Sequence, residues 1–341
     1  MKLSHSASSA AEAVEPVSWK GLEPLRILTG QTASGKSAVA VCLAKTCDAE
    51  IISLDSMKLY RGLDIGSAKP SLKTREEARF HLVDVVEPTE AFSLARFLGA
   101  AHEAAVKIVA AGRRPLFVGG TPLYLRGLLY GIFSGPGADW SMRESLMQRA
   151  QREGPQSLHD ELAALDPVAA ARLHPNDLTR VIRALEVVRG TGRPLSAHQT
   201  QFPAERPAVA SRMVVLRRSE EDLQNRIRLR AKRMFDAGLV EEAKALSERG
   251  ALSRPLQKAI GYREVLAYLR GEHTLDETIE LVRRNTWRMA RKQMTWFRSF
   301  PKAQWLDVSP DEPAEAIARR ASEMLFGSDW SGIVPGTQTN F

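Results

Sequence analysis

A phosphate-binding loop is predicted near the start of the chain, where the residues run Gly30-Gln31-Thr32-Ala33-Ser34-Gly35-Lys36-Ser37. This run matches the pattern G-x-x-x-x-G-K-[ST] without a gap. Glycines allow successive backbone N–H groups to turn toward one anion. The lysine adds a positive charge at the outer phosphates, and the hydroxyl of the final serine is a ligand that Mg²⁺ accepts. The loop therefore predicts a di- or triphosphate ligand, without deciding which one.

Asp55 is the candidate for acid–base chemistry, because it directly follows the apolar run at residues 50–54. A nucleoside triphosphatase is expected to carry an acidic residue after such a run. After the comparable run at residues 115–118, however, the chain continues with Gly119-Gly120-Thr121. If both runs are parallel strands, Asp55 lies at the same sheet edge as the phosphate loop. A general base is one interpretation of Asp55, and a turn or helix N-cap is the other.

Alternating strands and helices are predicted to position these residues. Short apolar runs predict strands at residues 25–29, 50–54 and 115–118, and helical periodicity predicts helices at residues 37–46 and 94–111. This order is typical of a parallel sheet with helices on both faces. We therefore predict an α/β fold with a P-loop NTPase-like parallel sheet core.

The second half of the chain follows a different pattern. Residues 140–192 are predicted to be helical, residues 213–216 form one more strand, and the chain from Glu220 onward is predicted to be helical. The expected organisation is a disordered N-terminal extension at residues 1–24, a core with C-terminal helices at residues 25–138 and 205–326, a helical insertion domain at residues 139–204, and a flexible tail at residues 327–341.

Basic residues are concentrated in one region. The formal net charge is +8, and residues 211–300 carry 20 Lys+Arg against 12 Asp+Glu, so the remainder is close to neutral. Such a region is either a set of solvated helical faces or a surface that contacts phosphates. Within it, residues 281–300 hold six Lys+Arg and no acid. On a helix they form an apolar face with Trp287, Ala290, Met294 and Phe297, and a basic face with Arg284, Arg288, Arg291, Thr295 and Arg298.

The two cysteines, Cys42 and Cys47, lie close together on one predicted helix without a histidine beside them. This spacing is neither a zinc pattern nor a disulfide framework, so the reducing cytoplasm is the expected location. No apolar run approaches the length needed to cross a membrane. Residues 1–24 also lack the apolar run of a secretory signal.

Several separate blocks of the sequence, in order, resemble the tRNA dimethylallyltransferase family. The phosphate loop departs from that family in two places, with Gln31 where proline is usual and Ser37 where threonine is common. Serine and threonine hydroxyls are equivalent as Mg²⁺ ligands. The remaining blocks are Asp55-Ser56-Met57-Lys58 and its continuation to Pro70, His81-Leu82-Val83-Asp84, Gly119-Gly120-Thr121-Pro122-Leu123-Tyr124, His174-Pro175-Asn176-Asp177, Arg183-Ala184-Leu185-Glu186-Val187, Gly261-Tyr262-Arg263, and Lys292-Gln293-Met294-Thr295-Trp296-Phe297-Arg298.

The resemblance implies a prenyl transfer from dimethylallyl diphosphate. The acceptor would be N6 of the adenosine at position 37, next to the anticodon, in tRNAs that read codons beginning with U; the products would be i6A and diphosphate. The loop and Mg²⁺ would hold the diphosphate as a leaving group, and Asp55 would take the proton of the adenine amine. Thr121 would assist near the reacting carbon, unless it is only a helix N-cap. Arg226 would be catalytic and Arg230 would bind the diphosphate, unless both belong to a solvated face.

The resemblance also implies contacts with the tRNA anticodon stem-loop by a protein that is expected to be monomeric. The target adenosine must be flipped out of its stack to react, and single-stranded loops allow this at low cost. The implied contact residues are Asp55, Ser56, Met57 and Lys58, then Thr179, Arg180, Val181, Ile182 and Arg183, and finally Gln257, Lys258, Gly261, Tyr262 and Arg263.

Three alternatives remain open from the sequence. An adenylate isopentenyltransferase would use the same donor and loop but accept free AMP, ADP or ATP, for which the insertion and the basic helices would be superfluous. A small-molecule kinase is supported by the loop alone. An RNA-binding module with a vestigial loop would bind tRNA without turnover.

Overall fold

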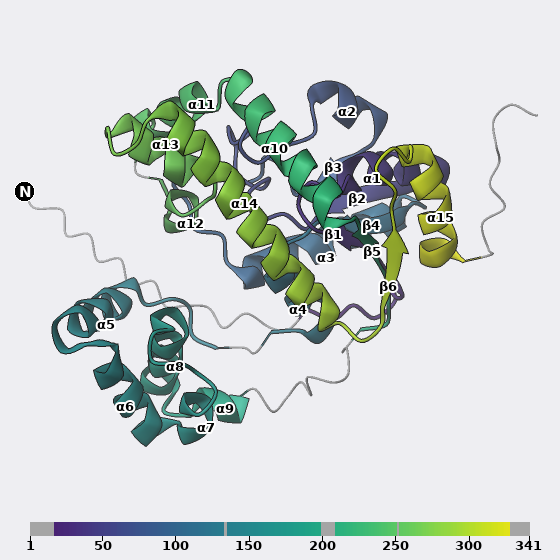
Figure 1. The fold of residues 1–341 in the computed structure, drawn as a ribbon. Helices are drawn as coiled ribbons and strands as arrows, with labels where there is room; N and C mark the ends of the chain where they lie inside the picture. The colour runs from purple at the N-terminus through teal and green to yellow at the C-terminus, as the bar shows by residue number, and fades with distance from the viewer. Residues whose placement is uncertain (1–16, 133–134, 199–208, 251, 328–341) are drawn as a thin grey trace, which may run out of the picture. The chain divides into compact units, whose positions relative to one another are not determined.

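The computed structural model describes residues 17–132, 135–198, 209–250 and 252–327, which contain a parallel β-sheet (Figure 1). Its strands are β1 (Leu25–Gly30), β2 (Ala49–Ser53), β3 (Phe80–His81), β4 (Arg114–Val118), β5 (Ser211–Arg217) and β6 (Ala303–Asp307). They lie in the order β3-β2-β4-β1-β5-β6, and each neighbouring pair is parallel. The predicted α/β fold is confirmed. Because β1, β4 and β2 are neighbours, the residues that follow them meet at one edge of the sheet.

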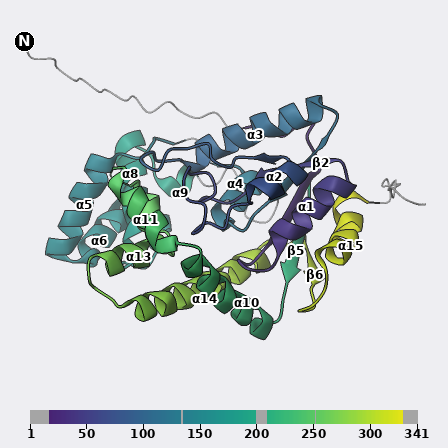
Figure 2. The same ribbon diagram turned by 90° about the horizontal axis from the view of Figure 1, so that it is seen from above.

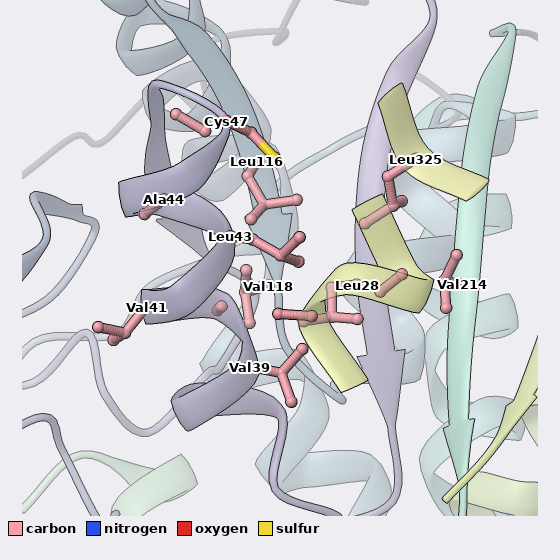
Figure 3. Close-up of a cluster of buried hydrophobic side chains, with 14 of the residues drawn as sticks. Leu28, Val39, Val41, Leu43, Ala44, Cys47, Leu116, Val118, Val214 and Leu325 are labelled. Carbon is pink, nitrogen blue, oxygen red and sulfur yellow. The ribbon is translucent and has the colours of Figure 1, made fainter. Parts of the chain in front are cut away.

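One face of the sheet is covered by α1 (Lys36–Thr46) and α15 (Ala314–Phe326). Side chains alternate between the two faces along a strand. Leu28 of β1 therefore packs against Leu43 of α1 and Leu325 of α15 in a fully buried cluster (Figure 3). This packing anchors α1 on the sheet, and the first two residues of α1, Lys36 and Ser37, are the last two of the phosphate loop.

The opposite face carries α3 (Leu94–Ala110) and an N-terminal segment. The Trp19 ring meets His102 of α3 edge to face at 5.4 Å between centroids and Phe117 of β4 at 5.7 Å. The prediction that the disordered extension reaches residue 24 was therefore wrong for residues 17–24, because Trp19, only 5% exposed, anchors this segment on the sheet. Residues 1–16 and 328–341, where disorder and flexibility were also predicted, lie outside the described residues.

The strand β6 corrects the prediction that the chain is helical throughout after Glu220. It pairs with β5 in parallel register, with Leu306 beside Leu216. Exposed and half-buried residues occupy most of this edge strand, and Leu306 is its one buried residue. No continuous apolar run therefore marks it in the sequence, and its identity as a strand depends on the neighbouring β5.

A group of helices packs beyond the carboxyl ends of the strands, and α10 and α14 run side by side within it (Figure 2). The helix α14 buries Ala290 and Phe297, whereas Arg288 and Arg291 are exposed, as its predicted amphipathic pattern requires. These helices are α10 (Glu220–Asp236), α11 (Leu239–Glu248), α12 (Arg254–Gln257), α13 (Tyr262–Leu269) and α14 (Leu275–Arg298). Two further helices are α2 (Leu72–Glu77), between β2 and β3 in the chain, and α4 (Pro122–Tyr130), after β4.

The described part of Tyr130–Ala208 forms a second compact unit that is entirely helical. Leu158, Leu162 and Leu185 belong to its buried core. Buried Glu186 accepts hydrogen bonds from Arg143 and Arg183, which ties two helices of this unit together. Its helices are α5 (Trp140–Glu153), α6 (Pro155–Leu165), α7 (Pro167–Ala170), α8 (Leu178–Thr191) and α9 (Leu195–His198). In neither unit is a described helix long and apolar enough to cross a membrane.

Candidate functional site

The predicted phosphate loop has the backbone shape of an anion cradle. It connects the end of β1 to the first residue of α1, where helix N–H groups point toward any bound anion. Ala33 and Gly35 have φ angles of 63° and 96°, in the left-handed region that turns successive N–H groups toward one side. A Cβ at Gly30 would lie 2.7 Å from the carbonyl oxygen of Leu216, so only glycine fits there. The hydroxyl of Ser34 is buried and has no protein partner among the described residues.

Cationic side chains bind the carbonyl oxygens of this loop. Lys36 Nζ donates to the carbonyl of Gln31 at 2.7 Å. Arg226 Nε donates to the carbonyl of Ala33 at 2.8 Å, and Arg218 Nε donates to that of Ser34 at 2.9 Å. These bonds fix the carbonyls of the loop and leave positive charge around it, which is the electrostatic requirement of a di- or triphosphate site.

Arg230, one helical turn after Arg226 on α10, also reaches the loop. Its Nη1 lies 3.4 Å from the Thr32 hydroxyl. Residues four apart share a helix face, so α10 presents two guanidinium groups to adjacent parts of the loop. The solvated-face alternative for these arginines does not match this geometry.

The helix α14 is hydrogen-bonded to the loop through two glutamines, Gln31 of the loop and Gln293 of α14. Gln31 donates through Nε2 to the carbonyl of Ala290 at 3.0 Å. Gln293 accepts from the N–H of Thr32 at 2.8 Å and donates to the carbonyl of Gly120 at 2.7 Å. Gln293 thus joins the phosphate loop to the turn after β4. Gln31, which stands where proline is usual, uses its side chain to bind the backbone of α14.

Burial and neighbouring charge depress the pKa of the loop lysine. Burial lowers the pKa of Lys36 to about 7, with a further contribution from Lys58 and opposition from Asp55. Burial likewise lowers the pKa values of Lys58 and Arg230, and Asp55 opposes both shifts. Three basic side chains therefore interact with the one carboxylate of Asp55, and an anionic ligand would favour their charged forms.

Asp55 adopts the turn geometry that its sequence position allowed. Its Oδ1 accepts the backbone N–H of Met57 at 2.9 Å and that of Lys58 at 3.4 Å. Among the hydrogen bonds of the described residues, none involves Oδ2. One carboxylate oxygen thus orients the side chain, and the second retains the lone pairs that a base requires.

Thr121 lies on the next turn and contacts the segment that contains Asp55. Its hydroxyl oxygen accepts the backbone N–H of Ser56 at 3.2 Å. Its carbonyl accepts from Tyr124 and Leu125 at 3.1 Å, at the start of α4. The backbone of Thr121 therefore begins the helix, whereas its hydroxyl is turned toward the Asp55 segment and does not cap α4.

A known family matches most of the chain, from just after Asp55 onward. The IPP transferase family model matches residues 58–300, which is more than half of the 341 residues. The chain belongs to the IPP transferase family. A second model, Isopentenyl transferase, matches residues 23–85, including the phosphate loop.

Curated relatives and solved structures agree with this family. The chain is 47% identical to tRNA dimethylallyltransferase 1 of Trichlorobacter lovleyi, over 82% of this chain and 92% of the relative. It is 43% identical to the tRNA dimethylallyltransferase of Anaeromyxobacter dehalogenans, over 88% and 99%. The solved tRNA isopentenylpyrophosphate transferase of Bacillus halodurans is 37% identical and covers 88% of this chain and 96% of its own, with a TM-score of 0.64. A eukaryotic dimethylallyltransferase acting on tRNA is 25% identical and covers 87% and 77%, with a TM-score of 0.73.

Three of the residues that the family resemblance implied as RNA contacts have buried side chains. Val181 and Ile182 are 0% and 3% exposed in the core of the helical unit. Tyr262 is 2% exposed and donates to Glu242. The alternation of buried and exposed residues on α8 and at the start of α13 turns these side chains inward, and a contact with RNA at these positions stays a prediction.

The other implied RNA-contact residues differ in their partners. Thr179 and Arg180 are exposed on α8, and Arg183 is engaged by Glu186 and by the carbonyl of Pro136. In the other unit, the side chains of Gln257, Lys258 and Arg263 are exposed, whereas Gly261 is buried.

Two residues that bind the loop were not predicted as site residues. Arg218 follows β5, and Gln293 lies on the buried side of α14. A signal existed for Gln293, because it is a polar residue beside the predicted apolar face of α14. Nothing in the sequence near Arg218 indicates that its partner is a loop carbonyl 184 positions earlier in the chain.

Proposed function

We propose that this IPP transferase family member transfers a dimethylallyl group from dimethylallyl diphosphate to N6 of the adenosine at position 37 of tRNAs that read codons beginning with U. The observation that carries the proposal is the pairing of a phosphate cradle with Asp55 and Thr121. The turn after β4, where a triphosphatase would carry an acid, has Gly119-Gly120-Thr121 instead. A cradle without a hydrolytic carboxylate suits a diphosphate that leaves intact.

The positive side chains around the loop are proposed to stabilise the diphosphate as it leaves. As the bond between carbon and oxygen breaks, negative charge accumulates on the departing diphosphate. Lys36, Arg226 and Arg230 lie at the loop to stabilise it. Lys36 and Arg226 are held by loop carbonyls and Arg230 by the Thr32 hydroxyl before the substrate arrives, so little reorganisation is needed.

Asp55 is proposed as the base that takes the proton from the adenine amine. Its Oδ1 is held by the turn at Met57 and Lys58, which orients Oδ2. Thr121 fixes the same segment through Ser56 and is proposed to act beside the reacting carbon. Proton transfer by a positioned carboxylate typically contributes 10²–10⁴-fold, by the general magnitude for acid–base catalysis.

A divalent metal fits this site if the substrate supplies most of its ligands, and we propose Mg²⁺. Among the described residues, no group of three or more His, Cys, Asp or Glu side chains is arranged to hold a metal ion. The exposed Ser37 hydroxyl lies at the first turn of α1, 3.5 Å from Lys58 Nζ. Mg²⁺ usually keeps several waters and binds substrate phosphates with few protein ligands. When bound, it would neutralise charge on the diphosphate, and Ser37 would be its protein ligand.

The acceptor is proposed to be the anticodon stem-loop of tRNA, bound by a monomeric cytoplasmic enzyme. The exposed basic residues of α14 supply sequence-independent contacts to phosphates. Exposed Arg180 on α8 and Arg263 on α13 are further candidates for RNA contacts. The names of the relatives, which are tRNA enzymes, favour this acceptor over free adenine nucleotides.

The acceptor is tested by competing unmodified tRNA against AMP with labelled dimethylallyl diphosphate. We expect kcat/KM for tRNA to exceed that for AMP by about 100-fold or more, because remote phosphate contacts contribute binding energy that AMP lacks. Equal prenylation of AMP would instead indicate an adenylate isopentenyltransferase.

A further inference from the structure

Glu242, in the first turn of α11, binds the backbone of the segment that follows Asp55. Its Oε2 accepts the N–H groups of Asp64 and Ile65, both at 2.8 Å, and its Oε1 accepts that of Gly66 at 3.0 Å. Three consecutive N–H groups that converge on one carboxylate form an anion-binding nest. Here the anion is a side chain 176 or more positions away in the sequence.

The buried tyrosine of α13 completes this arrangement. Tyr262 donates its hydroxyl to Glu242 Oε1 at 2.7 Å. Its ring packs on Gly66 so closely that a Cβ there would lie 2.4 Å from the ring. The carboxylate therefore receives four hydrogen bonds from two different parts of the chain, and charge-assisted bonds of this kind are roughly twice as strong as neutral ones.

The bound turn is rigidly connected to Asp55. Leu59 and Leu63, between the two, are fully buried. Lys69 Nζ donates to the carbonyl of Tyr60 at 2.5 Å and pairs with Asp64 and Asp84. The segment from Asp55 to Lys69 is therefore fixed at its start by the Asp55 turn, in its middle by buried leucines, and near its end by Glu242 and Lys69.

Glu242 also lies where three segments with proposed functional residues meet: the Asp55–Lys69 segment, α10 and α13. The helix α10, with Arg226 and Arg230, ends at Asp236, just before α11 begins at Leu239. Tyr262 begins α13 and precedes Arg263, a proposed RNA contact. We propose that Glu242 is a positioning residue for the transfer reaction: it fixes the Asp64–Gly66 turn and thereby holds the Asp55 carboxylate in register with the diphosphate loop. This inference rests on the proposed function.

The test compares Glu242→Gln with Glu241→Gln, an exposed neighbour that makes none of these contacts. An amide cannot accept all four bonds, because its NH₂ opposes a donor. We expect Glu242→Gln to lower kcat about 10-fold or more, with KM for dimethylallyl diphosphate within about 2-fold of wild type, because the loop itself is untouched. Glu241→Gln is expected to match wild type. Tyr262→Phe, which removes one donor and keeps the ring, is expected to lower kcat by a smaller factor.

The decisive measurement is the effect of Glu242→Gln on the residual rate of the Asp55→Asn variant. If Glu242 acts through Asp55, adding Glu242→Gln to Asp55→Asn should change the residual rate by less than about 2-fold, because both changes remove the same contribution. An undiminished 10-fold loss in that background, or wild-type kcat in Glu242→Gln, would overturn the proposal. If Glu242→Gln does not fold, the same comparison is made with Tyr262→Phe. Failure of the wild-type protein to prenylate tRNA would contradict the proposed function instead.

Discussion

Thr121 accepts the backbone N–H of Ser56 at 3.2 Å, and its own N–H donates to the carbonyl of Leu54 at 3.3 Å, so the two bonds join the turns after β4 and β2. The strands β2 and β4 are neighbours in the sheet, with Ser53 beside Val118. Their carboxyl ends therefore bring Asp55 and Thr121 together, although 65 positions separate Ser56 from Thr121. The sheet topology assembles the proposed base and its supporting hydroxyl.

Replacing Thr121 tests whether this hydroxyl matters for turnover. Thr121→Val keeps the shape but leaves the Ser56 N–H without its acceptor, so we expect kcat to fall about 10- to 100-fold. Thr121→Ser retains the oxygen and is expected to stay within about 3-fold of wild type. Single-turnover prenyl transfer measures both. Equal rates for the valine and serine variants would show that the hydroxyl has no role.

Gln293 is expected to contribute to both stability and substrate affinity. It is 8% exposed, and Gln293→Ala leaves the Thr32 N–H and the Gly120 carbonyl without their partner. Each of the two unsatisfied groups costs about 1–3 kcal/mol, so the free energy of unfolding should fall by about 2–6 kcal/mol. KM for dimethylallyl diphosphate should rise, because the loop loses a support. Urea unfolding and steady-state kinetics test this, with exposed Thr295→Ala as the control. An unchanged KM for dimethylallyl diphosphate in Gln293→Ala would show that the support of the loop by α14 does not affect donor binding.

Arg226 and Arg228 provide a matched pair on α10. Arg226 reaches the loop, whereas exposed Arg228 binds Asn225 at 2.9 Å, and residues two apart face different directions. Arg226→Gln should raise KM for dimethylallyl diphosphate about 10- to 100-fold, the value of one charge-assisted bond. Arg228→Gln should leave it unchanged. Similar effects from both substitutions would mean that only the net charge of α10 matters.

The sequence predicted the parts of the site that depend on local chemistry. Glycine spacing predicted the loop, and apolar periodicity predicted the strand before it and the helix after it. Arg218 was not predictable, because its role depends on β5 lying beside β1. Glu242 is one of several acids in the sequence of α11, and only the tertiary fold brings Asp64, Ile65 and Gly66 to it. Long-range partners of this kind leave no local pattern.

Diphosphate binding is expected to protonate Lys36 above neutral pH. Burial lowers its pKa to about 7 in the ligand-free protein, so at pH 8 about nine-tenths of these lysines are neutral. A bound anion favours the ammonium and raises the pKa, so wild type should take up close to one proton more than Lys36→Met when inorganic diphosphate binds in metal-free buffer at pH 8. At pH 6 the difference should vanish. Calorimetry in buffers of different ionisation enthalpy measures it; equal proton uptake by the two proteins would contradict the assigned pKa.

The central claim is that the loop holds a leaving diphosphate while a tRNA adenine accepts the carbon. The most direct measurement is reaction of unmodified tRNA with dimethylallyl diphosphate and Mg²⁺, followed by mass spectrometry of the nucleotides and quantification of released diphosphate. We predict one dimethylallyl group on the adenosine at position 37 for each diphosphate released, and loss of turnover with retained tRNA binding in Asp55→Asn. Phosphoryl transfer from ATP without use of dimethylallyl diphosphate, or full turnover by Asp55→Asn, would contradict it.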